Sequence, residues 1–222
     1  MGAIAERIAR PVRVSHPLVT VAGLKVAAGN CLLACSFFIA MIPAARALSW
    51  NLSGIANIVW LVGAAVMGTL SFVRTIPRST MVNAGTITAS GGMLLLPCLM
   101  RPISPSTGGV ELTGLMLELF GITLTQVARV YMGRSFGVLP ANRGVVSKGP
   151  FSWVRHPIYF GWLILATGYA VSYPTPRNII VVASTLPFMV WRIEQEETHL
   201  SEDPEYCTYE KRVRFRLWPG VI

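Results

Sequence analysis

Apolar segments of membrane-spanning length are the feature that most limits what this chain can fold into. Six of them succeed one another, at about 26–44, 54–73, 83–100, 110–132, 158–173 and 176–192. A helix needs roughly 20 mainly apolar residues to cross the hydrocarbon core of a bilayer. Only 13% of the residues are charged, which leaves too little polar surface to cover a globule in water. The sequence therefore predicts an all-α, polytopic membrane helix bundle with about six transmembrane helices.

The lysines and arginines predict how these helices are oriented. Of the 19, Arg46, Arg101 and Arg177 lie at the first, third and fifth connections, and the other 16 lie near the two ends of the chain and at the second and fourth connections. Positive residues collect in cytoplasmic loops. Both the N- and C-termini are therefore predicted to be cytoplasmic, and residues 1–222 are expected to form a single integral membrane domain.

The net charge of +9 does not indicate a nucleic-acid-binding protein. The basic residues stand singly or in pairs at the borders of apolar runs and form no basic stripe interleaved with exposed aromatic residues. Cys31 and Cys35 are one helical turn apart within an apolar run, and no CxxC pair is present, so we expect no metal site. Phosphate-binding glycine loops and the HExxH motif are also absent from the sequence, which disfavours soluble nucleotide chemistry.

An Arg155-His156-Pro157 turn stands directly before the fifth apolar segment. Proline is favoured at the first position of a helix, so a helix is predicted to begin at Pro157. Its free N–H groups and the positive end of its dipole would suit an anionic group, and Tyr159 would share that edge of the helix. The spacing alone equally fits interfacial anchoring by arginine and aromatic residues.

Carboxylates follow the sixth apolar segment in the stretch WRIEQEETHL. Arg192 and Glu196 are four residues apart and share a helical face, and Glu197 is turned by about 100° from Glu196. The pattern fits a surface ion pair of small energetic value. It also fits a site for a cationic ligand, because carboxylates at a hydrocarbon boundary are costly unless they meet a cation. Glu118, inside the fourth segment, is either functional or bonded to polar groups of neighbouring helices.

The two polar pieces together resemble a known family. The chain reads GVVSKGPFSWVRHPIYFGW and, about 30 residues on, RIEQEETHLSEDPEYCTYEKRVRFRLWPGVI. This pattern, over residues 129–222, is similar to the isoprenylcysteine carboxyl methyltransferase family and its bacterial relatives among membrane phospholipid methyltransferases. Phe151 stands where the family usually has tyrosine, and Asp203-Pro204 stands where a Phe-Gly pair is common. The resemblance divides the chain into four N-terminal spans, 26–132, and a catalytic half, 133–222, with a helical hairpin and a cytoplasmic tail.

The resemblance implies S-adenosyl-L-methionine as methyl donor, bound on the cytoplasmic side. By position, eight residues would surround this cofactor: Arg143, Gly144, Val145, Val146, Phe151, His156, Tyr159 and Glu196. Three more would act in catalysis or orientation: Arg155, Arg192 and Glu197. Arg192 would face the acceptor, and Glu197 or Glu118 would serve as a base if the acceptor is an amine.

The predicted function is therefore methyl transfer to a lipid-soluble acceptor. That acceptor is the carboxylate of an isoprenylcysteine-like or other small isoprenoid or lipid acid, or a lipid amine. The expected partners are this acceptor and membrane lipids, with no nucleic acid. We expect a multi-pass protein of a bacterial inner membrane with its active site facing the cytoplasm. Two alternatives remain at this point: a non-catalytic scaffold or transporter, and an NADPH-dependent enzyme similar to sterol reductases.

Overall fold

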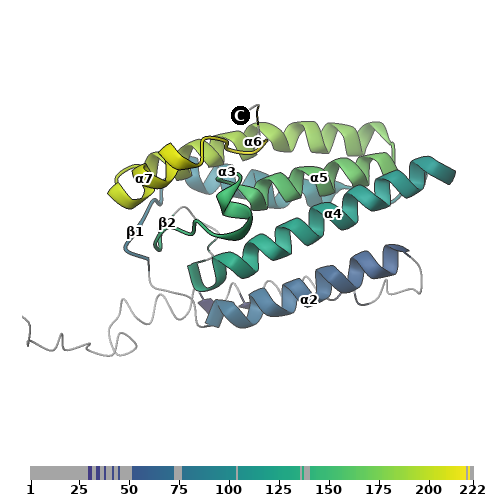
Figure 1. Ribbon diagram of the computed structural model, residues 1–222. Helices are drawn as coiled ribbons and strands as arrows, with labels where there is room; N and C mark the ends of the chain where they lie inside the picture. Colours follow the sequence, from purple (N-terminus) through teal and green to yellow (C-terminus); the bar gives the residue numbers. More distant parts are fainter. Residues whose placement is uncertain are drawn as a thin grey trace, which may run out of the picture.

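The computed structural model describes residues 52–72, 77–103, 105–135, 137, 141–218 and 220, and single residues at 30, 31, 34, 35, 38, 42 and 45. Long helices dominate the described residues, which confirms the predicted all-α class (Figure 1). Most of the first expected span, 26–44, lies outside the described residues. The cytoplasmic placement of the two termini stays a prediction.

The described elements follow one another along the chain as helices joined by short connections. The helices are α2 (Leu52–Phe72), α3 (Ala84–Leu95) continued by a 3-10 turn (Leu96–Leu99), α4 (Gly108–Met132), α5 (Pro157–Ser172), α6 (Pro176–Leu200) and α7 (Pro204–Arg212). Short 3-10 turns also occur at Gly133–Ser135 and Gly149–Ser152. Two antiparallel two-residue strands, β1 (Ser79–Thr80) and β2 (Ala141–Asn142), pair Ser79 with Asn142 and Thr80 with Ala141.

Polar side chains and prolines set where the helices begin. α5 begins at Pro157, as the sequence predicts, and α6 begins at Pro176 behind the Thr175 side chain, which accepts a hydrogen bond from Asn178 N. Asn83 caps α3 in a capping box with Thr86. Asp203 caps α7 with its side chain, which accepts a hydrogen bond from Glu205 N, so the Asp-Pro pair that departs from the family pattern starts a helix here.

Glycines allow α4 and α5 to pack with their backbones in close contact. A Cβ atom added to Gly121 would lie 2.4 Å from Leu165 N and 2.6 Å from Gly161 O, and one added to Gly161 would lie 2.5 Å from Thr125 Oγ1. About two turns further along α5, a Cβ atom added to Gly168 would lie 2.7 Å from Gly114 O. Small residues that let helices approach in this way are typical of helix packing in membranes.

Length and composition allow one described helix, Gly108–Ser135, to cross a membrane. Shorter apolar helices lie at Leu61–Phe72, Ala84–Leu99 and Pro157–Ser172. The count of six spans therefore stays a prediction. Figure 1 shows the long helices running side by side, with α7, β1 and β2 gathered at one end of the bundle, which we call the α7 end.

Candidate functional site

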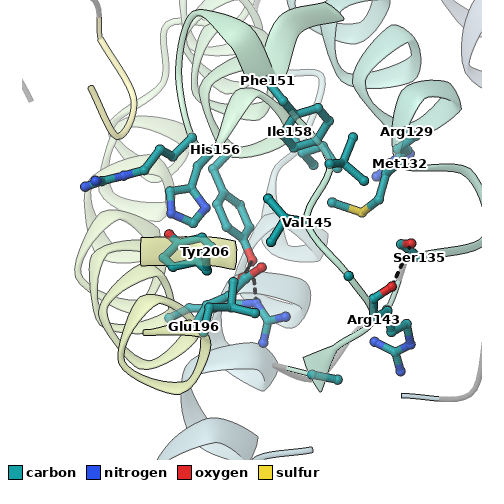
Figure 2. A pocket seen from close by; sticks show the side chains of 18 of the residues that line it. Arg129, Met132, Ser135, Arg143, Val145, Phe151, His156, Ile158, Glu196 and Tyr206 are labelled. Atoms are coloured by element: carbon teal, nitrogen blue, oxygen red, sulfur yellow. Dashed lines mark hydrogen bonds between the residues drawn. The ribbon is translucent and has the colours of Figure 1, made fainter. Parts of the chain in front are cut away.

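A cavity of about 220 Å³ opens at the α7 end, where segments far apart in the sequence meet. Its walls come from α3, α4, the segment 141–146, the turn before α5, and helices α5, α6 and α7. Figure 2 shows Glu196 and Tyr206 on one side of this cavity, Arg143 and Ser135 on the other, and Val145 between them. The structure thus brings the two predicted polar pieces together around one space.

Almost every residue that the sequence singles out lines this cavity. The lining set includes Arg143, Gly144, Val145, Val146, Phe151, Arg155, His156, Tyr159, Arg192 and Glu196. Glu197 is the one predicted site residue outside it. Arg155 and Glu196, which belong to different polar pieces, therefore share one cavity.

Tyr159 connects the cation and the carboxylate of α6. Its hydroxyl accepts a hydrogen bond from Arg192 Nε at 2.7 Å and donates one to Glu196 Oε2 at 2.9 Å. The sequence predicts that Arg192 and Glu196 share a face, and it does not reveal the hydroxyl between them. The result is a fixed row of a guanidinium, a phenol and a carboxylate along one wall of the cavity.

Glu197 lies behind that wall, among basic side chains. Its Oε1 is 2.9 Å from Arg155 Nε and 3.0 Å from His156 Nε2, and its Oε2 accepts from Arg216 Nε at 2.8 Å. Burial alone would raise the pKa of Glu197, but the hydrogen bond with His156 and the charges of Arg155 and Arg216 outweigh it and lower the pKa. A carboxylate held in this way is a weak base, so this geometry favours a structural role for Glu197 over removal of a proton, and its role in catalysis stays a prediction. Glu197 holds the Arg-His pair in place.

The C-terminal segment closes the site from behind through its main chain. Arg155 N donates to Phe215 O at 2.8 Å, and His156 N donates to Arg216 O at 2.9 Å. Leu217 is buried beside Met189 and Ile193 of α6. The turn before α5 therefore has the tail on one side and the cavity on the other.

Asn142 fixes the segment that carries Arg143 to Val146. Its side chain donates to Asp203 Oδ2 at 2.6 Å and accepts from Gly144 N at 3.0 Å. Its main-chain oxygen accepts from Arg78 N at 2.7 Å. Gly144 has a φ of 93°, a left-handed conformation that favours glycine. The hydrogen bond from Asn142 is the main cause of the lowered pKa of Asp203, so this carboxylate stays ionised while it caps α7.

Several lining residues were not assigned to the site from the sequence. They are Ser90, Met93 and Leu94 of α3, Thr125, Arg129 and Met132 of α4, and Tyr206 and Tyr209 of α7. Tyr209 donates its hydroxyl to Phe151 O at 2.8 Å, and burial raises the pKa of both tyrosines, which keeps them neutral. The Tyr-x-x-Tyr spacing is part of the family pattern, whereas a lone serine or threonine in a helix is typical of packing. No local pattern distinguishes Ser90 from the other small residues of α3.

Glu118 lies away from this cavity. It is not among the lining residues, and Ser172 Oγ donates to its Oε1 at 2.6 Å. Its position, 11 residues before Arg129 on α4, corresponds to about 16 Å along the helix axis. The structural interpretation of Glu118 therefore fits the geometry better than a role at the site.

The fold and the cavity define a helical protein in which one cavity brings basic and acidic side chains together next to apolar ones. The model of the isoprenylcysteine carboxyl methyltransferase family matches residues 114–202 of this chain, which confirms the resemblance drawn from the sequence. The matched region contains the helices α5 and α6 and the Arg-His-Pro turn. The central part of the chain is therefore related to a family of methyltransferases.

Named relatives agree with this family. Protein-S-isoprenylcysteine O-methyltransferase of Mus musculus is 34% identical over 46% of this chain and 38% of its own length, and that of Homo sapiens is 32% identical over 47% and 39%. The chain thus spans less than half the length of these relatives. The enzyme of the same name from Saccharomyces cerevisiae is 24% identical over 79% of this chain and 82% of its own length.

Proposed function

We propose that this protein is a membrane methyltransferase that uses S-adenosyl-L-methionine and methylates the carboxylate of an isoprenylcysteine-like acceptor. The observation that carries this proposal is the row formed by Arg192, Tyr159 and Glu196 in the cavity that both polar pieces line. Opposite charges held side by side suit two reactants, one carrying a positive centre and one a carboxylate. The names of the relatives support the same reaction.

The residues present fit this methyl donor. Glu196 offers a carboxylate to its positively charged groups, and the aromatic rings of Phe151 and Tyr206 lie along the same cavity. When bound, S-adenosyl-L-methionine supplies a methyl group activated by a sulfonium. At the start of α5, the first intrahelical bond runs from Phe160 N to His156 O, which leaves the N–H groups of Ile158 and Tyr159 for an anionic group such as the donor's carboxylate.

The remaining predicted residues frame the donor site. The segment Arg143, Gly144, Val145 and Val146 lines the cavity, with Arg143 on the side opposite Glu196 (Figure 2), and His156 and Arg155 line it at the turn before α5. Arg155 stays oriented by Glu197 and by Glu210, whose Oε1 accepts from Arg155 Nη1 at 2.8 Å. Its role would be to place the turn and to add positive charge near the donor's carboxylate.

A carboxylate acceptor suits this cavity better than an amine. A carboxylate is already ionised at neutral pH and needs only orientation, which Arg192 can provide. A lipid amine would need a base to remove a proton. Glu197 is engaged by three basic side chains, Glu118 lies along α4 away from the cavity, and Glu196 is hydrogen-bonded by Tyr159.

The position of the site fits a lipid-soluble acceptor. α4, the helix long and apolar enough to cross a membrane, reaches the cavity with Thr125, Arg129 and Met132. An acceptor in the bilayer would thus approach beside the helices while the donor arrives from water. We place residues 1–222 as one integral membrane domain of a bacterial inner membrane, with the cavity facing the cytoplasm.

Transfer of label from methyl-labelled S-adenosyl-L-methionine tests this function directly. The purified protein in nanodiscs receives N-acetyl-S-farnesylcysteine or, separately, phosphatidylethanolamine as acceptor. We expect label in the farnesylcysteine, released as methanol by alkali, because a methyl ester hydrolyses there and an N-methyl group does not. Label in the phosphatidylethanolamine would overturn the acceptor class. No label in either, with no stabilisation by the donor, would overturn the function.

A further inference from the structure

We infer that Ser90 of α3 is a positioning residue that fixes the guanidinium of Arg192 for the acceptor's carboxylate. This inference rests on the proposed function and adds to the site a helix that lies outside the region matched by the family model, 114–202. Ser90 lines the cavity and is 4% exposed. Arg192 is 6% exposed, so the two groups meet where water screens little of their interaction.

The hydroxyl of Ser90 is fixed from both sides. It donates its hydrogen to Thr86 O at 2.6 Å, one turn earlier in α3. With that hydrogen used, its lone pairs face outward, and it accepts a hydrogen bond from Arg192 Nη1. A serine hydroxyl that donates to its own helix and accepts from a charged partner is held in one orientation and does not rotate freely.

α3 is itself anchored and closely packed against α6. Asn83 and Thr86 form the capping box one turn before Ser90, so the carbonyl that orients the hydroxyl belongs to a fixed turn. A Cβ atom on Gly92 would lie 2.4 Å from the Phe188 ring, and one on Gly85 would lie 3.2 Å from Trp191. The glycines of α3 allow this close approach to α6, which brings Ser90 within reach of Arg192.

Two bonds set the plane of the guanidinium. Tyr159 takes the Nε hydrogen, and Ser90 takes one hydrogen of Nη1. A guanidinium has five N–H donors in a fixed fork, so three donors stay available in a plane that α3 and α5 determine. A carboxylate recognised by an arginine needs two such donors in parallel. Without Ser90, the guanidinium would rotate about the bond to Tyr159 and lose this alignment.

Kinetics of Ser90→Ala test the inference. We expect kcat/KM for N-acetyl-S-farnesylcysteine to fall about tenfold or more, since a hydrogen bond to a charged group is removed. KM for S-adenosyl-L-methionine and the stabilisation of the protein by this donor should change less than twofold, because Ser90 orients the acceptor side. Ser90→Thr, which keeps the hydroxyl, should recover most of the activity.

Ser71→Ala is the matched control. Ser71 is also buried in a helix and also donates to the carbonyl four residues earlier, Met67 O, at 2.7 Å. It is not among the residues that line the cavity. Its variant should keep kcat/KM for both substrates within twofold of the unchanged protein.

The outcomes separate this inference from the proposed function. If the unchanged protein methylates farnesylcysteine and Ser90→Ala behaves as Ser71→Ala does, Ser90 has no positioning role. Equal losses for donor and acceptor, or no recovery in Ser90→Thr, would also overturn it. If Ser90→Ala does not fold, Ser90→Cys, which keeps the volume and weakens the acceptor atom, is measured with the same expectations. An unchanged protein without methyl transfer overturns the proposed function itself.

Discussion

Glu196 and Glu197 are neighbours in the sequence, yet α6 turns their carboxylates into different surroundings. Glu196 faces the cavity and accepts from Tyr159, whereas Glu197 is 6% exposed and meets Arg155, His156 and Arg216. At the scale of single residues, one acid therefore lines the cavity and the other is surrounded by basic side chains of the fold. The two carboxylates have different neighbours because successive side chains of a helix are rotated by about 100° from one another.

Neutralising each acid in turn should separate these roles. Glu197→Gln is expected to lower the free energy of unfolding by about 3 kcal/mol, because buried basic groups lose their counter-charge. Glu196→Gln should keep a melting temperature near that of the unchanged protein but lose the stabilisation by S-adenosyl-L-methionine. Melting curves in detergent with and without this donor measure both effects. A Glu197→Gln protein as stable as its parent would contradict the structural role.

The lowered pKa of Glu197 also predicts how stability depends on pH. A carboxyl group whose pKa is lower in the folded state contributes stability that is fully present above its unfolded pKa, near 4.5, and is lost as the pH falls through the folded value. The difference in melting temperature between the unchanged protein and Glu197→Gln should therefore shrink as the pH falls below about 4.5. A difference that keeps its pH 5 value down to pH 3 would contradict the assignment.

At the scale of elements, the pairing of α4 with α5 depends on glycines that leave no space for a side chain. Gly161→Ala would place a methyl group 2.5 Å from Thr125 Oγ1 and is expected to cost about 1–3 kcal/mol. Gly91→Ala, in the interior of α3, meets no atom within 4 Å and should be neutral or stabilise by about 0.5–1 kcal/mol. Unfolding in denaturant measures both, and equal effects would show that close packing is not what these glycines provide.

The elements were easier to predict from the sequence than the contacts between them. α5 begins at Pro157 in the structure, as the sequence predicts, because a proline favours a helix start through local backbone geometry alone. The Arg-His-Pro turn and Glu196 were expected to meet, and they line one cavity. Ser90 was missed because its role depends on the distance of closest approach between α3 and α6, which no local pattern encodes. The basic surroundings of Glu197 include Arg216, which lies 19 residues further along the chain, so a local pattern does not reveal them either.

At the scale of the whole molecule, Asn142 ties together three segments that are far apart in the sequence: the connection before α3, the wall of the cavity and the start of α7. Asn142→Ala should loosen Gly144 and its neighbours and weaken binding of S-adenosyl-L-methionine about tenfold, as measured by titration calorimetry. Arg78→Ala is the control, because Arg78 is 63% exposed where it pairs with Asp203 and surface pairs contribute little. Equal losses of affinity in Asn142→Ala and Arg78→Ala would indicate that both changes weaken the α7 end in general and would contradict a specific role for Asn142.

The tail meets the turn before α5 through carbonyl oxygens, at Phe215 and Arg216, and not through its side chains. Every amino acid has a carbonyl, so a change of side chain at either position would leave both main-chain bonds intact, although a change of Arg216 would also remove its bond to Glu197. An insertion or deletion between α7 and Leu217 would instead place different carbonyl groups beside the turn before α5. It would also move Leu217 out of its buried position. Related chains should therefore differ more freely here in composition than in spacing.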